Sequence, residues 1–262
     1  MPVLTRRRTL HKARIQHLPT NEHGRDLIVG DLHGHLETLT RALDALGFEP
    51  ERDRVLSVGD LVDRGPDSAG CLALLREPWF HAVMGNHEDL LLGSVRELRA
   101  THGSDPRFAM HQNNGGEWLL RVWPPDTALA QAIERTRLLP HVLVVGAGPA
   151  RYHVVHAGFA IGTTNSAIDQ GELGDPEGLM WRRSLGQALR EMDPADDHGP
   201  RDAAGLSTTY CGHTIGSDRH GRPLRGHGHV NLETGVAQGN RLSIAVRDRA
   251  GREVIHQQAV QG

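Results

Sequence analysis

Three short apolar runs recur in the first third of the chain, and each ends in glycine followed by a polar residue. They are DLIVGD (26–31), VLSVGD (55–60) and HAVMGN (81–86). Apolar residues at helical spacing follow each run, and after the first run they end at Gly47, which is placed as a helix C-cap. This repeated strand–helix order predicts parallel strands joined by right-handed crossovers. The final Asp or Asn of each run then lies just past the carboxyl end of a strand, where functional groups gather in such sheets.

The pattern changes after this repeat. Residues 93–140 are mostly helical in pattern, with breaks at SDP, NNGG and WPP, which predicts a helical insertion over one edge of the site. VVGAGPA resembles a nucleotide-binding glycine loop, but the strand pattern RYHVVH follows it in place of the required helix. We therefore expect a hairpin between VLVV and YHVVH. In the last third, TTYCGHT, HVNLETG and LSIAVRD predict short strands, and residues 191–205 predict a polar loop.

The composition of the 262 residues is that of a globular protein, with 38% hydrophobic and 23% charged residues. The net charge of −3 gives no general reason to expect binding to nucleic acid or to an anionic membrane. Cys71 and Cys211 form no CxxC pair, and no apolar run reaches membrane-spanning length. We therefore expect a reducing, cytoplasmic location without a disulfide framework.

The chain begins MPVLTRRRTLHKAR, which is basic but lacks the apolar stretch of a secretory signal. Residues 1–24 therefore predict a basic N-terminal tail. A plain solvated leader is favoured over a segment that contacts phosphate or an acidic partner. Residues 25–262 show no linker or low-complexity segment, so we expect them to form one domain that includes the helical insertion.

Histidine is unusually frequent, with 18 residues against two tyrosines. Oxygen and imidazole groups are placed at the strand ends or just beyond them: Asp31, His33, Asp60, Asn86, His87, His156 and His213. The two side chains of a DxH pair in an extended segment point to the same side. Donors of this type suit manganese, iron or zinc, and their number, with one carboxylate shared, predicts a site for two metal ions.

The motifs GDLHG, GDLVDRG, GNHE, HAG and GHT, in this order, resemble those of the phosphoprotein phosphatase (PPP) family of metallophosphoesterases. The similarity covers about residues 25–246 and points to bacterial and bacteriophage serine/threonine protein phosphatases. It implies an α/β fold of the calcineurin-like metallophosphoesterase type. This fold is a four-layer sandwich in which two mixed β-sheets are flanked by helices, with residues 25–262 as a single catalytic domain.

The resemblance implies two divalent metal ions, with manganese expected first and iron or zinc as alternatives. Asp31 and His33 would bind the first ion, and Asp60 would bridge to the second. The second ion would be completed by Asn86, His156 and His213.

The same resemblance assigns catalysis to His87 as general acid, oriented by Asp63. Arg64 would bind phosphate together with an arginine of MWRRS, for which Arg183 has the family spacing and Arg182 is the alternative. A metal-bridging hydroxide would attack the phosphomonoester directly, without a phosphoenzyme. The expected substrate is a phosphorylated protein or peptide.

Two other functions are weighed against this one. A diadenosine tetraphosphate (dinucleoside polyphosphate) hydrolase uses the same scaffold, but such relatives typically differ at the position of Asp63 and carry GNHD where this chain has GNHE. A non-catalytic binding module would normally have lost a ligand, and all ligand positions are filled. The HGG motif and docking surface of the eukaryotic branch have no visible match, so no eukaryotic-type regulatory subunit is expected.

The remaining polar residues of note receive no role in the site. They are His35, His81, His102, His111 and Glu233. The sequence GHGH (226–229) is interpreted as a loop that leads into a strand rather than as a further metal site.

Overall fold

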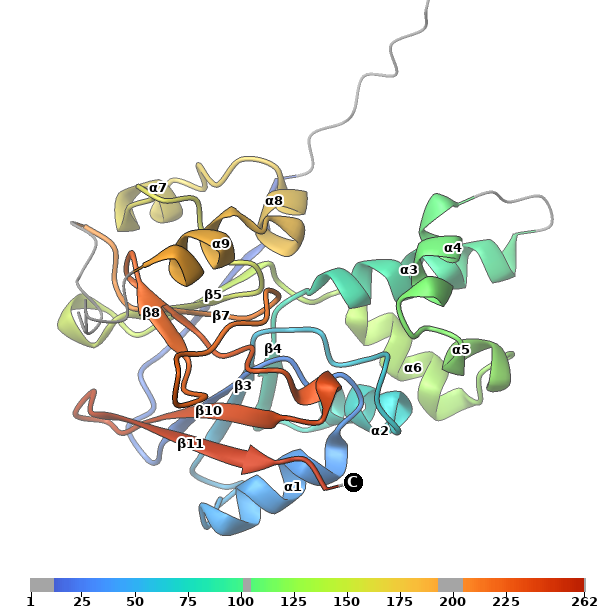
Figure 1. Ribbon diagram of the computed structural model, residues 1–262, viewed down its shortest axis with the longest axis horizontal. Helices are drawn as coiled ribbons and strands as arrows, with labels where there is room; N and C mark the ends of the chain where they lie inside the picture. Colours follow the sequence, from blue (N-terminus) through green and yellow to red (C-terminus); the bar gives the residue numbers. More distant parts are fainter. Residues whose placement is uncertain (1–11, 101–104, 193–204, 262) are drawn as a thin grey trace, which may run out of the picture.

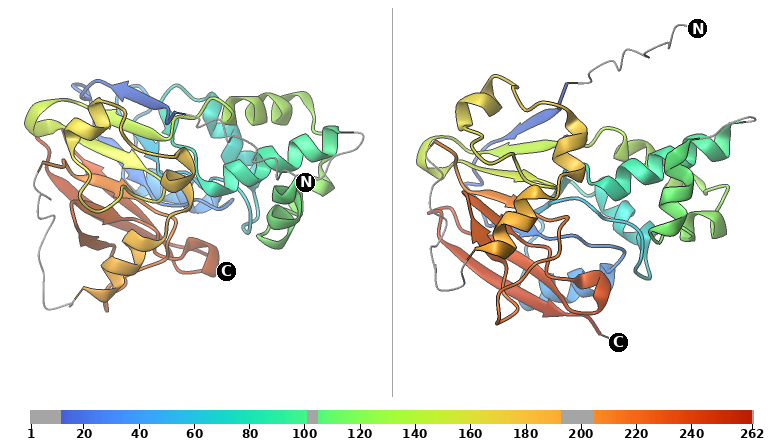
Figure 2. Two further views of the ribbon diagram at one scale, coloured as in Figure 1. Left: turned by 90° about the horizontal axis from the view of Figure 1, so that it is seen from above. Right: turned by 45° about the horizontal axis from the view of Figure 1, so that its top comes forward.

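The computed structural model describes residues 12–100, 105–192 and 205–261. Two β-sheets lie at its centre, and helices flank both of them (Figures 1 and 2). In the five-stranded sheet the order is β11 (Glu253–Ala259), β10 (Arg241–Arg247), β2 (Asp26–Val29), β3 (Arg54–Ser57) and β4 (Phe80–Ala82). In the six-stranded sheet it is β1 (Ile15–Leu18), β5 (Val142–Val145), β6 (Tyr152–Val155), β7 (Thr209–Cys211), β9 (His229–Asn231) and β8 (Leu224–Gly226).

The three apolar runs of the first third form β2, β3 and β4, which pair in parallel as predicted. The connections contain α1 (Leu36–Ala45) and α2 (Ser68–Ala73). Gly47 follows α1 with a φ of 57°, and the side chain of Asp67 accepts a hydrogen bond from the backbone N–H of Gly70 at the start of α2. Local capping chemistry thus marks the end of α1 and the start of α2.

Inner strands such as β2, β5 and β6 are buried on both faces, which explains the continuous apolar runs. Leu27 and Val29 pack with residues of α1, α2, α3 (Asn86–Arg99) and α6 (Thr127–Thr136), whereas Ile28 between them packs against the six-stranded sheet. In the same way Val142 and Val144 face α8 (Pro176–Trp181) and α9 (Ser184–Glu191), and Leu143 faces the other sheet. The order helices, sheet, sheet, helices confirms the predicted four-layer sandwich.

Between β4 and β5 the described chain is helical and lies to one side of the sandwich (Figures 1 and 2). It forms α3 (Asn86–Arg99), α4 (Pro106–Asn113), α5 (Trp118–Arg121) and α6 (Thr127–Thr136). The predicted start of the insertion at residue 93 falls inside α3, which continues because Val95 and the partly buried Leu98, beyond that position, pack in the core.

The glycine-rich segment after β5 is a hairpin turn, as predicted, because β5 and β6 pair antiparallel with Val145 opposite Tyr152. GHGH likewise forms the turn between the antiparallel strands β8 and β9. A short helix, α7 (Asn165–Asp169), follows β6. Residues 193–204, most of the predicted polar loop, lie outside the described residues.

The prediction of a tail through residue 24 is wrong for residues 15–18, which form β1 at the edge of the six-stranded sheet. β1 pairs in parallel with β5, and the N–H of His141 donates to the carbonyl of Arg14. The strand escaped prediction because only two of its four residues are even half-buried. Residues 1–11, which include the arginine cluster, lie outside the described part.

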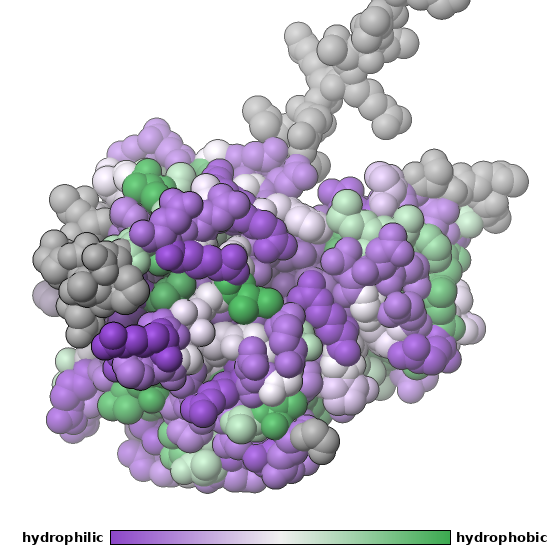
Figure 3. Space-filling model, in the orientation of Figure 1, coloured by the Kyte–Doolittle hydropathy of each residue, from purple (hydrophilic) through white to green (hydrophobic). Residues whose placement is uncertain are grey.

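The face shown in Figure 3 is mainly hydrophilic, with small, separate apolar areas. Among the described residues no helix combines the length and the apolar character that crossing a membrane requires.

Candidate active site

The predicted ligands lie where the carboxyl ends of parallel strands from both sheets meet. Asp31, Asp60 and Asn86 follow β2, β3 and β4, whereas His156 and His213 follow β6 and β7. All five side chains are buried. The sheets are joined directly here, since the backbone N–H of His213 donates to the Asp31 carboxylate over 3.1 Å.

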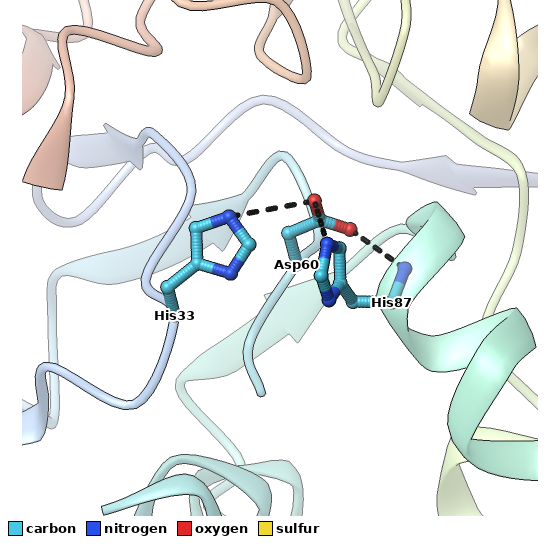
Figure 4. Close-up of side chains that lie close together, drawn as sticks. All are labelled: His33, Asp60 and His87. Atoms are coloured by element: carbon cyan, nitrogen blue, oxygen red, sulfur yellow. Dashed lines mark hydrogen bonds and ion pairs between the residues drawn. The ribbon is translucent and has the colours of Figure 1, made fainter. Parts of the chain in front are cut away.

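Asp60 is the centre of this cluster. Its Oδ2 lies 3.7 Å from His33 Nε2 and 3.9 Å from His87 Nε2, and the two rings approach it from different elements (Figure 4). Its Oδ1 lies 3.3 Å from His156 Nε2. Two groups of donors that could hold a metal ion therefore share Asp60: one with His33 and His87, the other with His156 and His213.

Backbone carbonyls fix which nitrogen of each imidazole faces the cluster. Nδ1 of His33 lies 3.0 Å from the carbonyl of Val62, and Nδ1 of His156 lies 2.8 Å from that of Val58. Because a carbonyl only accepts, each Nδ1 carries the proton and each Nε2 presents a lone pair to the cluster. In His213 the roles are reversed, because Nε2 faces a carbonyl over 3.2 Å and Nδ1 faces inward.

The Asn86 amide oxygen meets two of these lone pairs, at 2.9 Å from His156 Nε2 and 2.8 Å from His213 Nδ1. The histidine lone pairs thus face a carboxylate and an amide oxygen, which are also acceptors, and no proton lies between them to form hydrogen bonds. A divalent cation satisfies all of them, so these residues fit the predicted metal ions.

The pKa values agree with this donor set. Burial lowers the pKa of His33 and of His213 to about 3, which keeps both rings neutral. Burial, followed by the nearby Glu233 and Asp60, raises the pKa of Asp31 well above its usual range. Glu233, which received no role from the sequence, is itself buried and has a pKa raised to about 7, chiefly by burial. Crowded buried carboxyl groups of this kind are stabilised as anions by bound cations.

The site backbone is strained. Six described non-glycine residues have positive φ, and five of them are predicted site residues: His33, Asp60, Asp63, Arg64 and His213. Such conformations cost energy and persist where the surrounding structure holds them, which is typical of functional sites. Glycines permit the close approach: at Gly212 a Cβ atom would lie 2.0 Å from Oδ1 of Asp31.

His87 and Asp63 form a buried pair. Nδ1 of His87 lies 2.6 Å from Oδ2 of Asp63, and Nε2 of His87 faces Asp60. Burial lowers the pKa of His87, but the carboxylates of Asp60 and Asp63 outweigh it and raise the pKa overall. Both His87 and Asp31 lie beside the His33 side of Asp60, since Oδ2 of Asp31 is 4.0 Å from His33 Nε2. The donor geometry alone thus offers two candidates, His87 and Asp31, as the further ligand of a metal ion held by His33 and Asp60.

The arginines also differ in placement. Nη1 of Arg64 donates to His33 Nε2 over 2.7 Å, so its guanidinium lies over the site. Burial is the largest cause of the lowered pKa values of His156 and His213. The charge of Arg183, an exposed residue, is a smaller cause that acts in the same direction. Arg182 lies against α8, where its guanidinium comes so close to Gly178 that a Cβ atom there would be 2.6 Å from Nη2. Arg183 therefore faces the site more directly than Arg182.

Three residues besides Glu233 lie at the site without an assigned role from the sequence. Glu88 accepts hydrogen bonds from the backbone N–H groups of Asp60, Leu61 and Gly85. His111 and Trp118 both contact Asp63. His111, expected to have no role, is fully buried. Glu88 could have been inferred from its position three residues after the N-cap Gly85, as in a capping box, whereas nothing local marks the other two.

A carboxylate shared by two groups of imidazoles, each of which could hold a metal ion, lies at the strand ends of a four-layer α/β sandwich, and this arrangement suits a metal-dependent hydrolase. Comparison with known families agrees with this class. The chain belongs to the calcineurin-like phosphoesterase family, whose sequence model matches residues 25–231. It is thus a metallophosphoesterase, and the family predicted from the motifs is confirmed.

Curated relatives include serine/threonine-protein phosphatase 1 of Salmonella typhimurium, 39% identical over 52% of this chain and 60% of that protein. Serine/threonine-protein phosphatase 2 of Escherichia coli is 32% identical over 64% of this chain and 75% of that protein. A symmetrical bis(5'-nucleosyl)-tetraphosphatase of Stutzerimonas stutzeri is 42% identical, but over only 29% of each chain. The match to the first relative spans less than two thirds of its length.

Solved structures share the fold. One titled a putative diadenosine tetraphosphatase has a TM-score of 0.62 at 24% identity and covers 94% of this chain and 98% of that one. A protein serine/threonine phosphatase from Saccharomyces cerevisiae has a TM-score of 0.61 at 18% identity and covers 96% of this chain and 85% of that one. At these identities the likeness supports the four-layer fold alone.

Proposed function

We propose that this protein is a metal-dependent phosphoprotein phosphatase that removes phosphate from serine and threonine residues of a protein or peptide. The observation that carries the proposal is the His87–Asp63 pair, with 2.6 Å between Nδ1 and Oδ2. A serine or threonine alkoxide is a strong base and leaves with a proton, which His87 can supply from Nε2. The names and extents of the bacterial phosphatase relatives support the same substrate class.

We assign the metal ligands as Asp31, His33, Asp60, Asn86, His156 and His213, with Asp60 shared. Two divalent ions held there would lower the pKa of water and stabilise charge on the phosphoryl group. Manganese is our first expectation from the family resemblance, and the carboxylate, amide and imidazole donors, which include no thiolate, suit manganese, iron or zinc. The free, buried thiols of Cys71 and Cys211 fit the proposed cytoplasmic location.

The chain's own residues would then divide the remaining work. Arg64 and Arg183 would bind phosphate oxygens, since a guanidinium fork matches two oxygens, and since Arg64 contacts His33 while the charge of Arg183 acts on His213. Asp63 accepts the Nδ1–H of His87 and so aims Nε2 toward the leaving oxygen. Water-derived hydroxide that attacks phosphorus from the side opposite the leaving oxygen displaces it directly, so no covalent intermediate with the protein is required.

A second function, hydrolysis of dinucleoside polyphosphates, is kept because tetraphosphatase relatives match 29% of the chain. One experiment separates the two. Metal-loaded protein is assayed on a phosphoserine peptide and on diadenosine tetraphosphate in the same preparation. We expect the larger kcat/KM on the peptide. A clear preference for the dinucleotide, whose polyphosphate leaving group needs little protonation, would overturn the proposal.

A further inference from the structure

The Asp63 carboxylate is held from the side opposite His87. Oδ1 of Asp63 accepts a hydrogen bond from Trp118 Nε1 over 2.7 Å and lies 3.0 Å from His111 Nε2. The other ring nitrogen of His111, Nδ1, lies 2.9 Å from Ser94 Oγ. Asp63, His111 and Ser94 are fully buried, and Trp118 is 8% exposed. Every oxygen of this carboxylate therefore has a fixed partner.

The direction of each hydrogen bond follows from the donors. The indole N–H of Trp118 can only donate, and Asp63 as a carboxylate can only accept. The His111 nitrogen that faces Asp63 therefore carries a proton, while its Nδ1 can accept the hydroxyl proton of Ser94. A neutral His111 satisfies both partners at once. Such a chain fixes the carboxylate in place without moving a proton.

The connection between α4 and α5 also contacts the backbone next to Asp63, at Arg64. The carbonyl of Gly115 accepts from the N–H of Arg64 over 3.3 Å. A Cβ atom on Gly115 would lie 2.6 Å from that nitrogen, and one on Gly116 would lie 2.4 Å from the His111 ring. Gly115 thus allows the connection to lie directly against the Asp63–Arg64 turn, whose two residues have φ values of 74° and 71°, and Gly116 leaves room for the His111 ring.

We propose that His111 and Trp118 are positioning residues that set the orientation of the general acid His87 through Asp63. By this route α4 and α5, which supply none of the assigned metal ligands, contribute to catalysis as well as to packing. The inference rests on the proposed function, in which His87 donates a proton to the leaving oxygen. Loss of either positioning residue should therefore slow reactions that need this proton and spare those that do not.

The test compares His111→Phe, which keeps the ring but loses both nitrogens, with His111→Gln, whose amide N–H can replace Nε2–H. Trp118→Phe removes the indole donor. Trp79→Phe is the matched control, because Trp79 packs between Phe48 and Phe80 at the far end of β4. For each metal-loaded variant, kcat and KM are measured on a phosphoserine peptide and on p-nitrophenyl phosphate, together with the melting temperature.

We expect His111→Phe and Trp118→Phe to lower kcat on the peptide about tenfold more than on the aryl phosphate, with little change in KM. His111→Gln should restore most of the peptide activity, and Trp79→Phe should behave like wild type. Equal losses on both substrates, or losses that follow only the melting temperature, would show that the two residues merely support the fold.

A measurement without substrate keeps this inference separate from the proposed function. In metal-free protein the His87 Nδ1 proton, shared over 2.6 Å, should give a downfield proton resonance. His111→Phe and Trp118→Phe should shift or broaden it, and Trp79→Phe should not. An unchanged resonance would overturn the positioning role, whereas wild-type protein inactive on phosphopeptide would overturn the proposed function.

Discussion

Glu88 holds the backbone of Asp60: its Oε2 accepts the Asp60 N–H over 2.8 Å, although the two residues come from different strand–helix units. The same carboxylate accepts from Leu61 over 2.7 Å and from Gly85 over 2.9 Å. One buried side chain thus joins the start of α3 to the turn that carries the shared ligand. This turn has a φ of 51° at Asp60, a conformation that needs such support.

Replacing Glu88 with glutamine should therefore destabilise the protein, because its NH2 group would face N–H donors. We expect a loss of roughly 2 kcal/mol in the free energy of unfolding, measured by urea denaturation of metal-free protein. Glu37→Gln on the exposed face of α1 is the control and should change little. A Glu88→Gln variant as stable as this control would contradict the role of Glu88.

Removal of metal should abolish activity, and manganese should restore it after chelation. Because Asp60 belongs to both donor groups, Asp60→Asn should lose both ions, whereas His213→Asn should lose one. Metal content per chain, measured by elemental analysis after dialysis, decides this. Two ions retained by Asp60→Asn would rule out a shared carboxylate.

His87→Asn should lower kcat on phosphoserine peptides about a hundredfold and hurt p-nitrophenyl phosphate much less, because the aryl leaving group is a weaker base. Similar losses on the two substrates would count against His87 as the acid. The metal content of the His87→Asn variant also decides whether His87 or Asp31 is the ligand beside His33. If His87 is a proton donor, the metal content stays unchanged, whereas if His87 is a ligand, the variant should lose one ion.

Arg183→Ala should reduce kcat/KM and weaken inhibition by inorganic phosphate, each by about tenfold or more, since a charge-assisted hydrogen bond to phosphate is lost. Arg182→Ala is the matched neighbour and should stay near wild type, because its guanidinium lies against α8. A larger effect at Arg182 would reverse the assignment.

Three buried histidines away from the metal ligands should make stability depend on pH. His141, His153 and His229 each accept an N–H through a ring nitrogen, and burial lowers their pKa values to about 4, 3 and 4. Below the unfolded value of about 6.5 the unfolded chain binds more protons, so stability falls as pH drops from 6.5 toward 4. The loss is on the order of 1 kcal/mol per pH unit for each histidine.

His229→Gln provides the check, since an amide oxygen can still accept the N–H of Phe159 but does not titrate. Urea unfolding of metal-free protein at pH 7.5 and pH 5 should show a smaller pH dependence for this variant than for wild type. Wild type and the variant have the same metal ligands, so the titration of these ligands contributes equally to both pH dependences and cancels in the comparison. Identical pH dependence would contradict the prediction.

Local patterns explain what could be predicted from the sequence. Each of the runs that form β2, β3 and β4 is apolar, short and ended by glycine, so strand, turn and ligand are encoded within six residues. The hairpin between β5 and β6 is equally local. Parallel pairing then brings Asp31, Asp60 and Asn86 to one edge without further information.

Other features depend on contacts between distant segments. β1 is a half-exposed edge strand whose partner β5 lies over a hundred residues away, so its four residues carry no pattern of their own. His111 and Trp118 lie 48 and 55 positions from Asp63, and only the packing of α4 and α5 brings them to it. A lone histidine in a helix is usually structural, and burial beside a carboxylate could not be inferred from its neighbours.

Of the six proposed ligands, four follow strands of the five-stranded sheet and two follow strands of the six-stranded sheet. Metal ions bound there would link the two sheets across the seam between them. By linkage, whatever favours binding to the folded chain also resists its unfolding. Heat resistance should then rise with free manganese, and in metal-poor surroundings the seam would be the first place where the two halves of the protein part.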